Sequence, residues 1–173
     1  TGCGFFAGKG ITTGARNTAV GTEVLNGACT GNDNTAVGAD SLKSNTGGSG
    51  NVAVGSHALH DNTTGTYNVA VGFEAAYNGH DAGHITAVGY QALKTSGTSA
   101  HHLTAVGAFA LTACNGSAEY CTAVGSKALQ SNTSGDNNTG IGYRALGGNT
   151  TGTINVAVGS NALLSNTTGA QNT

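Results

Sequence analysis

The chain repeats itself every seventeen residues along its whole length, and this period limits the possible folds more than any other feature. The repeated cell reads Asn-(Thr/Val)-Ala-Val-Gly-x-x-Ala-Leu-x-x-Asn-Thr-Thr-Gly-x-x, and only two of its steps, between Gly89 and Gly125, are eighteen residues long. A fixed period is typical of proteins in which each unit buries its apolar face only against its neighbours. The glycine of the cell recurs at Gly4, Gly21, Gly38, Gly55, Gly72, Gly89, Gly107, Gly125, Gly142 and Gly159.

The pattern inside the cell predicts strands rather than helices. Apolar side chains follow Thr/Val-x-Val, with the period of two of a strand, and Gly, Asn and Thr are poor helix formers. A coil of seventeen residues has room for two short strands and two corners, and ten coils stacked about 4.8 Å apart make a rod of about 48 Å. We therefore predict an all-β chain, a parallel β-solenoid (β-roll) of about ten coils that forms a single domain over residues 1–173, with an irregular middle over about 78–121.

Composition excludes several other classes of protein. Charged residues make up 8% of the chain, against about 25% in an average soluble domain. Glycine-rich, weakly charged chains can be disordered, but Val, Ala and Leu recur here in strict register, which a flexible linker does not require. With a net charge of −2 and only six Lys and Arg, the chain has no basic stripe for nucleic acid. No apolar run is long enough to span a membrane.

The strand segment of the cell predicts one inward and one outward face. β-Branched residues precede the glycine and fit an inward strand position, so the expected core ladder is Val20, Val37, Val54, Val71, Val88, Val106, Val124, Ile141 and Val158. A second column of Thr and Val lies two residues earlier and shares the inward face. The alanine column between these two columns would then face outward. Its constancy indicates close packing, either against another part of the coil or at a subunit interface, for which the candidates are Ala19, Ala36, Ala53, Ala70 and Ala87.

Two further columns complete the expected coil. A second apolar ladder comes after the glycine at Leu42, Leu59, Leu93, Leu111, Leu129, Leu146 and Leu163. The Asn-Thr-Thr-Gly segment that follows predicts a corner, because Asn and Gly adopt left-handed turn conformations at low cost.

The asparagine that begins the cell predicts a column of stacked side chains. Stacked amides hydrogen-bond to one another along such a column, as in cross-β ladders. Ile85, Leu103 and Cys121 replace it in three successive cells, where the period also slips to eighteen. The expected Asn ladder is Asn17, Asn34, Asn51, Asn68, Asn138 and Asn155.

The cell resembles a known type of repeat. The segments Asn34-Thr35-Ala36-Val37-Gly38 and Tyr90-Gln91-Ala92-Leu93 are similar to the head repeats of YadA-like trimeric autotransporter adhesins, and closer still to the seventeen-residue Asn-Thr-Ala-Val-Gly repeats of phage tail-fibre-like proteins. The resemblance covers essentially the whole chain. It implies a parallel β-roll, left-handed in the adhesins, that is commonly assembled as a trimer. The period here is longer than in the adhesin heads, so the cross-section of the coil is expected to differ.

The residues that usually carry chemistry give only weak signals. Cys114 and Cys121 flank a six-residue turn in one of the eighteen-residue cells and are candidates for a disulfide. The alternative is that all four cysteines are small buried thiols. His84 and His102 occupy one column of neighbouring cells and are weak candidates for metal ligands, although no Cys or carboxylate completes a ligand set. We expect no metal site, no cofactor, no catalytic residues and no enzyme activity.

The leading functional prediction is structural. The chain is expected to be a subunit or segment of an extracellular, cell-surface or virion fibre, with copies of itself as partners in a homotrimer or a head-to-tail filament, and with no nucleic acid and no membrane span. One alternative is an adhesin-type module that binds a surface glycan or a protein receptor through the His-rich middle and the variable rim. The variable rim is the second position after each glycine of the cell from Gly21 onward, at Glu23, Asp40, His57, Glu74, Gln91, Phe109, Lys127, Arg144 and Asn161. A less favoured alternative is ice binding, because the Thr column is mixed with Val and is expected to face inward.

Overall fold

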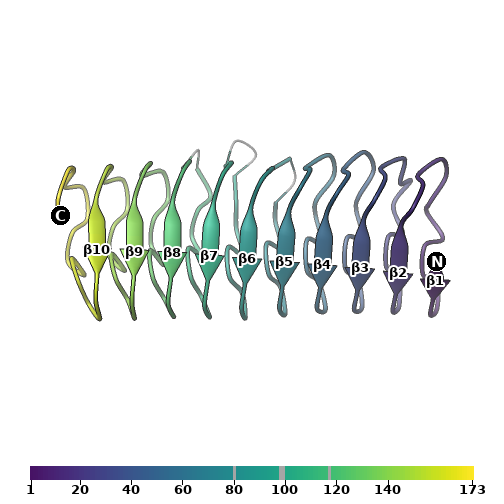
Figure 1. Cartoon of the computed structure of the whole chain (residues 1–173), viewed down its shortest axis with the longest axis horizontal. Helices are drawn as coiled ribbons and strands as arrows, with labels where there is room; N and C mark the ends of the chain where they lie inside the picture. The colour runs from purple at the N-terminus through teal and green to yellow at the C-terminus, as the bar shows by residue number, and fades with distance from the viewer. Residues whose placement is uncertain (80, 98–99, 117) are drawn as a thin grey trace.

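The computed structural model shows one stack of coils along a single axis (Figure 1), and it describes residues 1–79, 81–97, 100–116 and 118–173. Each coil contributes one short strand, and the strands lie in chain order in one parallel ten-stranded sheet. The chain is therefore an all-β parallel solenoid, as predicted. The strands are β1 Gly2–Cys3, β2 Thr18–Val20, β3 Thr35–Val37, β4 Val52–Val54, β5 Val69–Val71, β6 Thr86–Val88, β7 Thr104–Val106, β8 Thr122–Val124, β9 Thr139–Ile141 and β10 Val156–Val158.

The register of the sheet follows the sequence period without a break. Val37 pairs with Val54, one cell later. Across the two longer cells, Val88 pairs with Val106 and Val106 pairs with Val124. The strands of the expected irregular middle are thus regular, and the extra residue of each longer cell lies in the connection between strands. Parts of that connection fall outside the described residues.

The opposite wall of the coil is not a second strand, so this part of the prediction is wrong for the described residues. That wall is made of turns whose backbones hydrogen-bond from coil to coil: Leu42 N donates to Ala58 O at 3.0 Å, and Leu59 N donates to Ala75 O at 3.0 Å. Asp40 and Leu42 have φ of 56° and 47°. Two left-handed residues so close together bend the backbone away from the extended conformation that a strand requires.

The inner face of the sheet is formed by alanine, which reverses the predicted orientation. The candidate interface residues Ala19, Ala36, Ala53, Ala70 and Ala87 are all completely buried within the single chain. The predicted core ladder faces outward and is half-buried to exposed: Val54 is 37% exposed and Val158 69%. Both predictions were therefore wrong, for Val20, Val37, Val54, Val71, Val88, Val106, Val124, Ile141 and Val158 as core and for the five alanines as a subunit interface.

The reason is the narrow space between the two walls. At Gly140, which replaces alanine in this column, an added Cβ would lie 2.9 Å from Ala145 O and 3.3 Å from Cγ of Leu129. A valine at such a position has no room for its two methyl groups, because protein interiors are already close-packed. The strand therefore turns its small residue inward, and leucines such as Leu59 and Leu129, completely buried as predicted, fill the rest of the core.

The cell's glycine forms the corner between the sheet and the turn wall. Its φ is 133° at Gly55 and 134° at Gly72, a conformation essentially restricted to glycine. A Cβ on Gly55 would also lie 2.5 Å from Gly72 O in the next coil. Glycine is thus required both by the backbone conformation and by the close approach of the coils.

Candidate functional site

The predicted Asn ladder is present inside the coil. Asn51 Nδ2 donates to Asn34 Oδ1 at 3.1 Å and to Gly65 O at 2.9 Å, and Asn51 Oδ1 accepts the backbone N–H of Asn68 at 3.0 Å. Each side chain thus bridges its own coil and the two neighbouring coils. Buried amides are stable only when hydrogen-bonded in this way, so the ladder ties successive coils together.

A second amide ladder runs beside the first, and the sequence reasoning missed it. Asn62 Nδ2 donates to Asn45 Oδ1 at 2.9 Å, and Asn149 Nδ2 donates to Asn132 Oδ1 at 2.8 Å. These asparagines were predicted to take left-handed turn conformations, but none of them has a positive φ. Their side chains point inward and are completely buried. The recurrence of asparagine at the start of the Asn-Thr-Thr-Gly segment was the available signal.

Both ladders stop in the same three coils. Ile85, Leu103 and Cys121 replace the first asparagine, and Gly79, Ser96 and Cys114 lie in the place of the second. The interruption leaves a polar atom unpaired at one end of the second ladder, where Asn62 Oδ1 has no hydrogen-bond donor among the described residues. At the other end, Asn132 Nδ2 donates to Sγ of Cys121 at 3.9 Å. Between Asn68 and Asn132, Ser96 is the only buried polar side chain among the described residues, so the core of the middle coils is mainly apolar, between two polar sections.

The predicted disulfide between Cys114 and Cys121 is absent, and both residues are buried free thiols. They occupy the two ladder positions, where they act as small apolar side chains. Burial raises the pKa of the Cys114 thiol from its usual value of 9.0 to about 12 and that of Cys121 to about 11. Deprotonation, and with it reactivity, is disfavoured at neutral pH.

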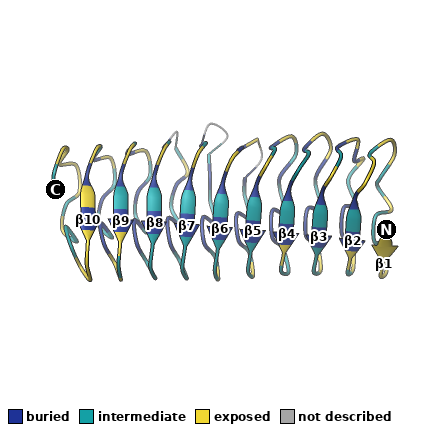
Figure 2. Cartoon of the chain, in the orientation of Figure 1, coloured by how far each residue is buried: buried dark blue, intermediate teal, exposed yellow. Residues whose placement is uncertain are grey.

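The first candidate site is the outward surface of the sheet, called the outer face below. It carries two parallel columns of short side chains, and Figure 2 shows the strands as intermediate to exposed along the rod. The first column is Thr18, Thr35, Val52, Val69, Thr86, Thr104, Thr122, Thr139 and Val156. The second is the Val and Ile column described above. No charged residue interrupts either column.

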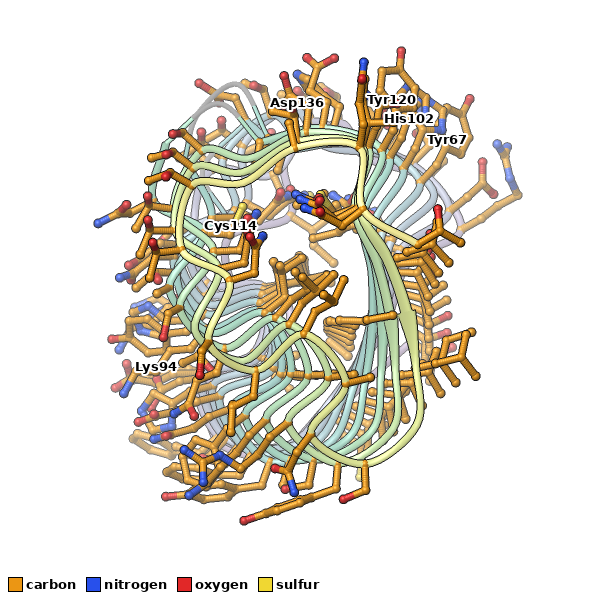
Figure 3. All side chains as sticks on the ribbon, turned by 90° about the vertical axis from the view of Figure 1, so that its left-hand side faces the viewer. Tyr67, Lys94, His102, Cys114, Tyr120 and Asp136 are labelled. Atoms are coloured by element: carbon orange, nitrogen blue, oxygen red, sulfur yellow. The ribbon has the colours of Figure 1, made fainter. Side chains whose placement is uncertain are left out.

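The second candidate site is a stack of exposed rings, called the aromatic column below: Tyr67, His84, His102 and Tyr120. The ring centroids are 5.5 Å apart for Tyr67 and His84, 5.1 Å for His84 and His102, and 5.1 Å for His102 and Tyr120, with interplanar angles of 22°, 7° and 4°. Figure 3 shows the labelled members one behind another at a corner of the coil, beside the outer face. The sequence reasoning identified the two histidines but not their stacking between tyrosines.

The metal-site hypothesis gains no support from this geometry. Rings stacked face to face direct their nitrogen lone pairs within parallel planes, so His84 and His102 do not converge on one point. In the described part of the chain, no three His, Cys, Asp or Glu side chains form a group suited to a metal ion. The His101 ring lies nearby and accepts the backbone N–H of Gly83 through Nδ1 at 3.0 Å.

The variable rim combines ion pairs with a second group of rings. Lys43 pairs with Glu23 at 2.7 Å and with Asp40 at 2.8 Å. Lys94 pairs with Glu74 at 2.7 Å and by this hydrogen bond lowers the pKa of that carboxyl group. Nearby rings are in contact through His57, His60, Phe73, Tyr77, Tyr90 and Phe109.

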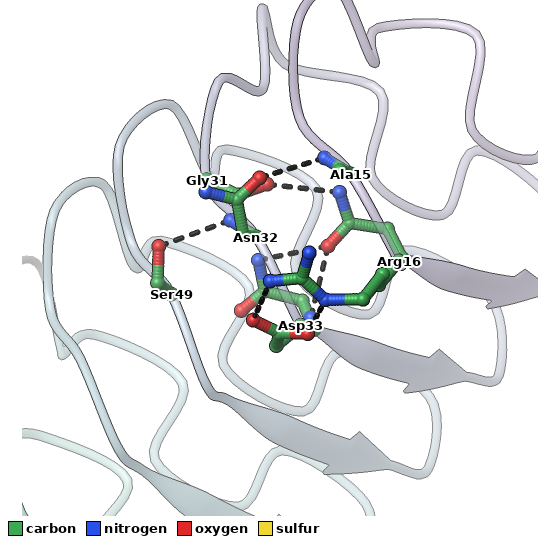
Figure 4. A network of polar contacts seen from close by, with 8 residues as sticks. Ala15, Arg16, Gly31, Asn32, Asp33 and Ser49 are labelled. Atoms are coloured by element: carbon green, nitrogen blue, oxygen red, sulfur yellow. Dashed lines mark hydrogen bonds and ion pairs between the residues drawn. The ribbon is translucent and has the colours of Figure 1, made fainter.

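Near the N-terminal end, polar side chains link the coils at the position of the aromatic column (Figure 4). The guanidinium group of Arg16 donates to Asp33 through Nη2 at 2.6 Å and lowers the pKa of this carboxyl group. Asn32 Oδ1 accepts from the backbone N–H of Ala15 at 2.7 Å, and Asn32 N donates to Ser49 Oγ at 3.0 Å. The same corner is thus polar here and aromatic in the middle.

No protein-family model, curated protein or solved structure matches this chain. Among the described residues, no helix is long and apolar enough to cross a membrane.

Proposed function

We propose that the chain is a structural segment of an extracellular, cell-surface or virion fibre, and that copies of it associate through the outer face in a homotrimer or filament. The observation that carries the proposal is the outer face itself. It presents an unbroken β-branched column from β2 to β10 without one charge. Monomeric soluble proteins rarely expose contiguous apolar surfaces of this kind, which usually mark interaction sites.

The interior supports a mechanical role. Coil-to-coil backbone hydrogen bonds and two amide ladders run parallel to the rod axis, so bending the rod would strain many short-range bonds at once. The resemblance of the cell to adhesin heads and phage tail-fibre repeats agrees with a fibre and with trimeric assembly. Extracellular or virion location rests on that resemblance.

A charge placed on the outer face tests this function. Val54→Lys and Val71→Lys put two ammonium groups in the centre of the face, where burial between subunits is strongly unfavourable. In analytical ultracentrifugation we expect the wild type to sediment as a multiple of the 16.8 kDa chain and the double variant as a monomer with an unchanged circular dichroism spectrum. Thr22→Lys, on the exposed position after Gly21, is the matched control and should assemble normally. A wild type that stays monomeric at high concentration would contradict the proposal.

Ice binding is the second candidate, because one of the two reasons for disfavouring it was wrong. The Thr column faces outward, not inward, and although it is mixed with Val, six of its nine members are threonine, so the face is a regular array of hydroxyl and methyl groups. The same face serves one role only, since subunits that cover it exclude ice. Thermal hysteresis in a monomeric sample would favour ice binding, and its absence together with oligomers would favour the fibre.

A further inference from the structure

The aromatic column combines two unfavourable features, exposed aromatic rings and a left-handed backbone. Its side chains are exposed, with Tyr67 at 64% and Tyr120 at 55%. All four residues have a positive φ, between 55° and 58°, which L-residues other than Asn, Asp and Gly adopt at a cost of about 1 kcal/mol or more each. In the other coils, the residue at the same position is mostly polar or glycine, as at Arg16, Asp33, Gly50, Asn137 and Gln171.

The column changes in the same coils in which the core beneath it changes. His84, His102 and Tyr120 directly precede Ile85, Leu103 and Cys121, the residues that replace the first amide ladder. The exposed aromatic column and the core residues beneath it thus change together over one stretch of the rod. The left-handed backbone at this position is common to the coils along the rod, but exposed rings occupy it only here. A local departure from favourable surface chemistry of this kind is expected at functional sites.

The geometry of the stack restricts what it can bind. The ring faces cover one another, so the edges point outward and present phenol O–H groups and imidazole nitrogens. The ring centroids follow one another along the rod at separations of 5.5, 5.1 and 5.1 Å. A fitting occupant is a linear polymer that lies along the axis and repeats hydrogen-bonding groups at nearly this interval.

Two common polymers do not fit. In an extended polypeptide, side chains on one face repeat every ~6.6 Å, so they lose register with the rings by more than 1 Å at each step. A nucleic acid needs basic side chains to neutralise its phosphates. The residues beside the column include Glu119 and Asp136, and the net charge of the chain is −2.

We propose that the aromatic column binds an extended β-1,4-linked polysaccharide of the cellulose or chitin type, lying parallel to the rod axis. The advance per sugar in such a chain is close to the step between rings. Each of four sugars then meets one rung, where its hydroxyl groups hydrogen-bond to the phenol or imidazole edge. The carboxylate of Asp136, which accepts the backbone N–H of Glu119 at 2.9 Å through Oδ1, lies on the same side of the coil as Tyr120 (Figure 3). It supplies a further acceptor for a sugar hydroxyl at that end.

This site is separate from the outer face, so the proposal does not depend on fibre assembly. The test is isothermal titration of the whole chain with cello- and chito-oligosaccharides of two to six units. We expect affinity to increase from two to four sugars, as rungs are occupied, and then to level off. Binding of either series supports the proposal, and a preference between the two identifies the substituent accepted at C2. Maltohexaose, the α-1,4-linked control, should not bind.

Variants at the column separate binding from folding. His84→Asn and His102→Asn together remove two rungs, and Asn137 shows that the column accepts asparagine with a φ of 55°. We expect at least a tenfold loss of hexasaccharide affinity with unfolding stability equal to or above that of the wild type. Tyr143→Asn, at an exposed tyrosine of another column, should bind normally. Absence of hexasaccharide binding at millimolar concentration, full binding by the double variant, or affinity independent of length would overturn the proposal.

Discussion

At the scale of single residues, the unusual feature is the number of left-handed backbone conformations occupied by residues other than glycine. They recur in three columns of the cell, at positions such as Asp40, Leu42 and Tyr67. The repeat fixes these conformations because each coil hydrogen-bonds to the next through them, as in Asp40 N to Thr22 O at 2.9 Å. The stacking of coils thus overrides the backbone preference of single residues. Replacing a residue that is strained in the left-handed conformation should therefore raise the stability of the chain.

Ile154 is the clearest such site. It is β-branched, 52% exposed and has a φ of 57°, a true outlier for its residue type. We predict that Ile154→Asn raises the free energy of unfolding by about 1 kcal/mol, because asparagine tolerates this conformation. Guanidinium chloride unfolding measures the change. Ile154→Val, which keeps the β-branch, should give no gain, and an asparagine variant no more stable than the wild type would refute the strain argument.

Asn51 tests the value of the amide ladder. Replacing it with alanine leaves the buried N–H of Asn68 without its acceptor and removes two donated bonds, so we expect a loss of about 2–3 kcal/mol in unfolding free energy. The matched control is Asn172→Ala on the last rung, which is partly exposed to water and should cost less than about 1 kcal/mol. Equal losses at the two positions in denaturant unfolding would mean that burial of the ladder is unimportant.

At the scale of the strand and its corner, the alternation of the sequence predicted a short strand but assigned the wrong side as inward. The exceptions to each column carried that information. The alanine column is relieved only by the smaller Gly2 and Gly140, whereas the valine column admits the larger Ile141. A position that accepts only smaller residues is sterically limited, and a position that accepts a larger residue has free space beside it. The two sides of the coil could therefore have been assigned from these substitutions rather than from hydrophobicity.

The corner glycine gives a prediction at this scale. Gly55 and Gly159 have similar φ of 133° and 126°, but a Cβ on Gly55 would lie 2.5 Å from Gly72 O, whereas one on Gly159 would meet nothing within 4 Å. We expect Gly159→Ala to cost about 1 kcal/mol, from backbone strain alone. Gly55→Ala should cost about 3 kcal/mol or more because the coils must also separate. Thermal denaturation of both variants would show whether coil spacing or backbone conformation fixes the corner.

At the scale of the whole molecule, the period was sufficient to predict a solenoid, because repetition leaves each coil only its neighbours as packing partners. The second amide ladder and the aromatic column were harder to predict. Each depends on which residues of a turn lie on top of one another, and that is set by the path of the turn rather than by strand periodicity. Their joint change in the middle coils divides a uniform rod into two polar-cored ends and an apolar-cored centre.

This division predicts how alkaline pH acts on the whole rod. The folded state raises the pKa of Cys114 to about 12 and of Cys121 to about 11, against 9.0 when unfolded. The unfolded chain therefore releases these protons first, so their stabilising effect is complete below pH 9 and is lost as pH rises toward 11–12. The loss approaches about 1.4 kcal/mol per pH unit for each thiol. Unfolding free energies measured at pH 8 and pH 10.5 should differ less in a Cys114→Ala, Cys121→Ala variant than in the wild type. Identical pH dependence in the two proteins would show that the central thiols do not couple protonation to the stability of the stack.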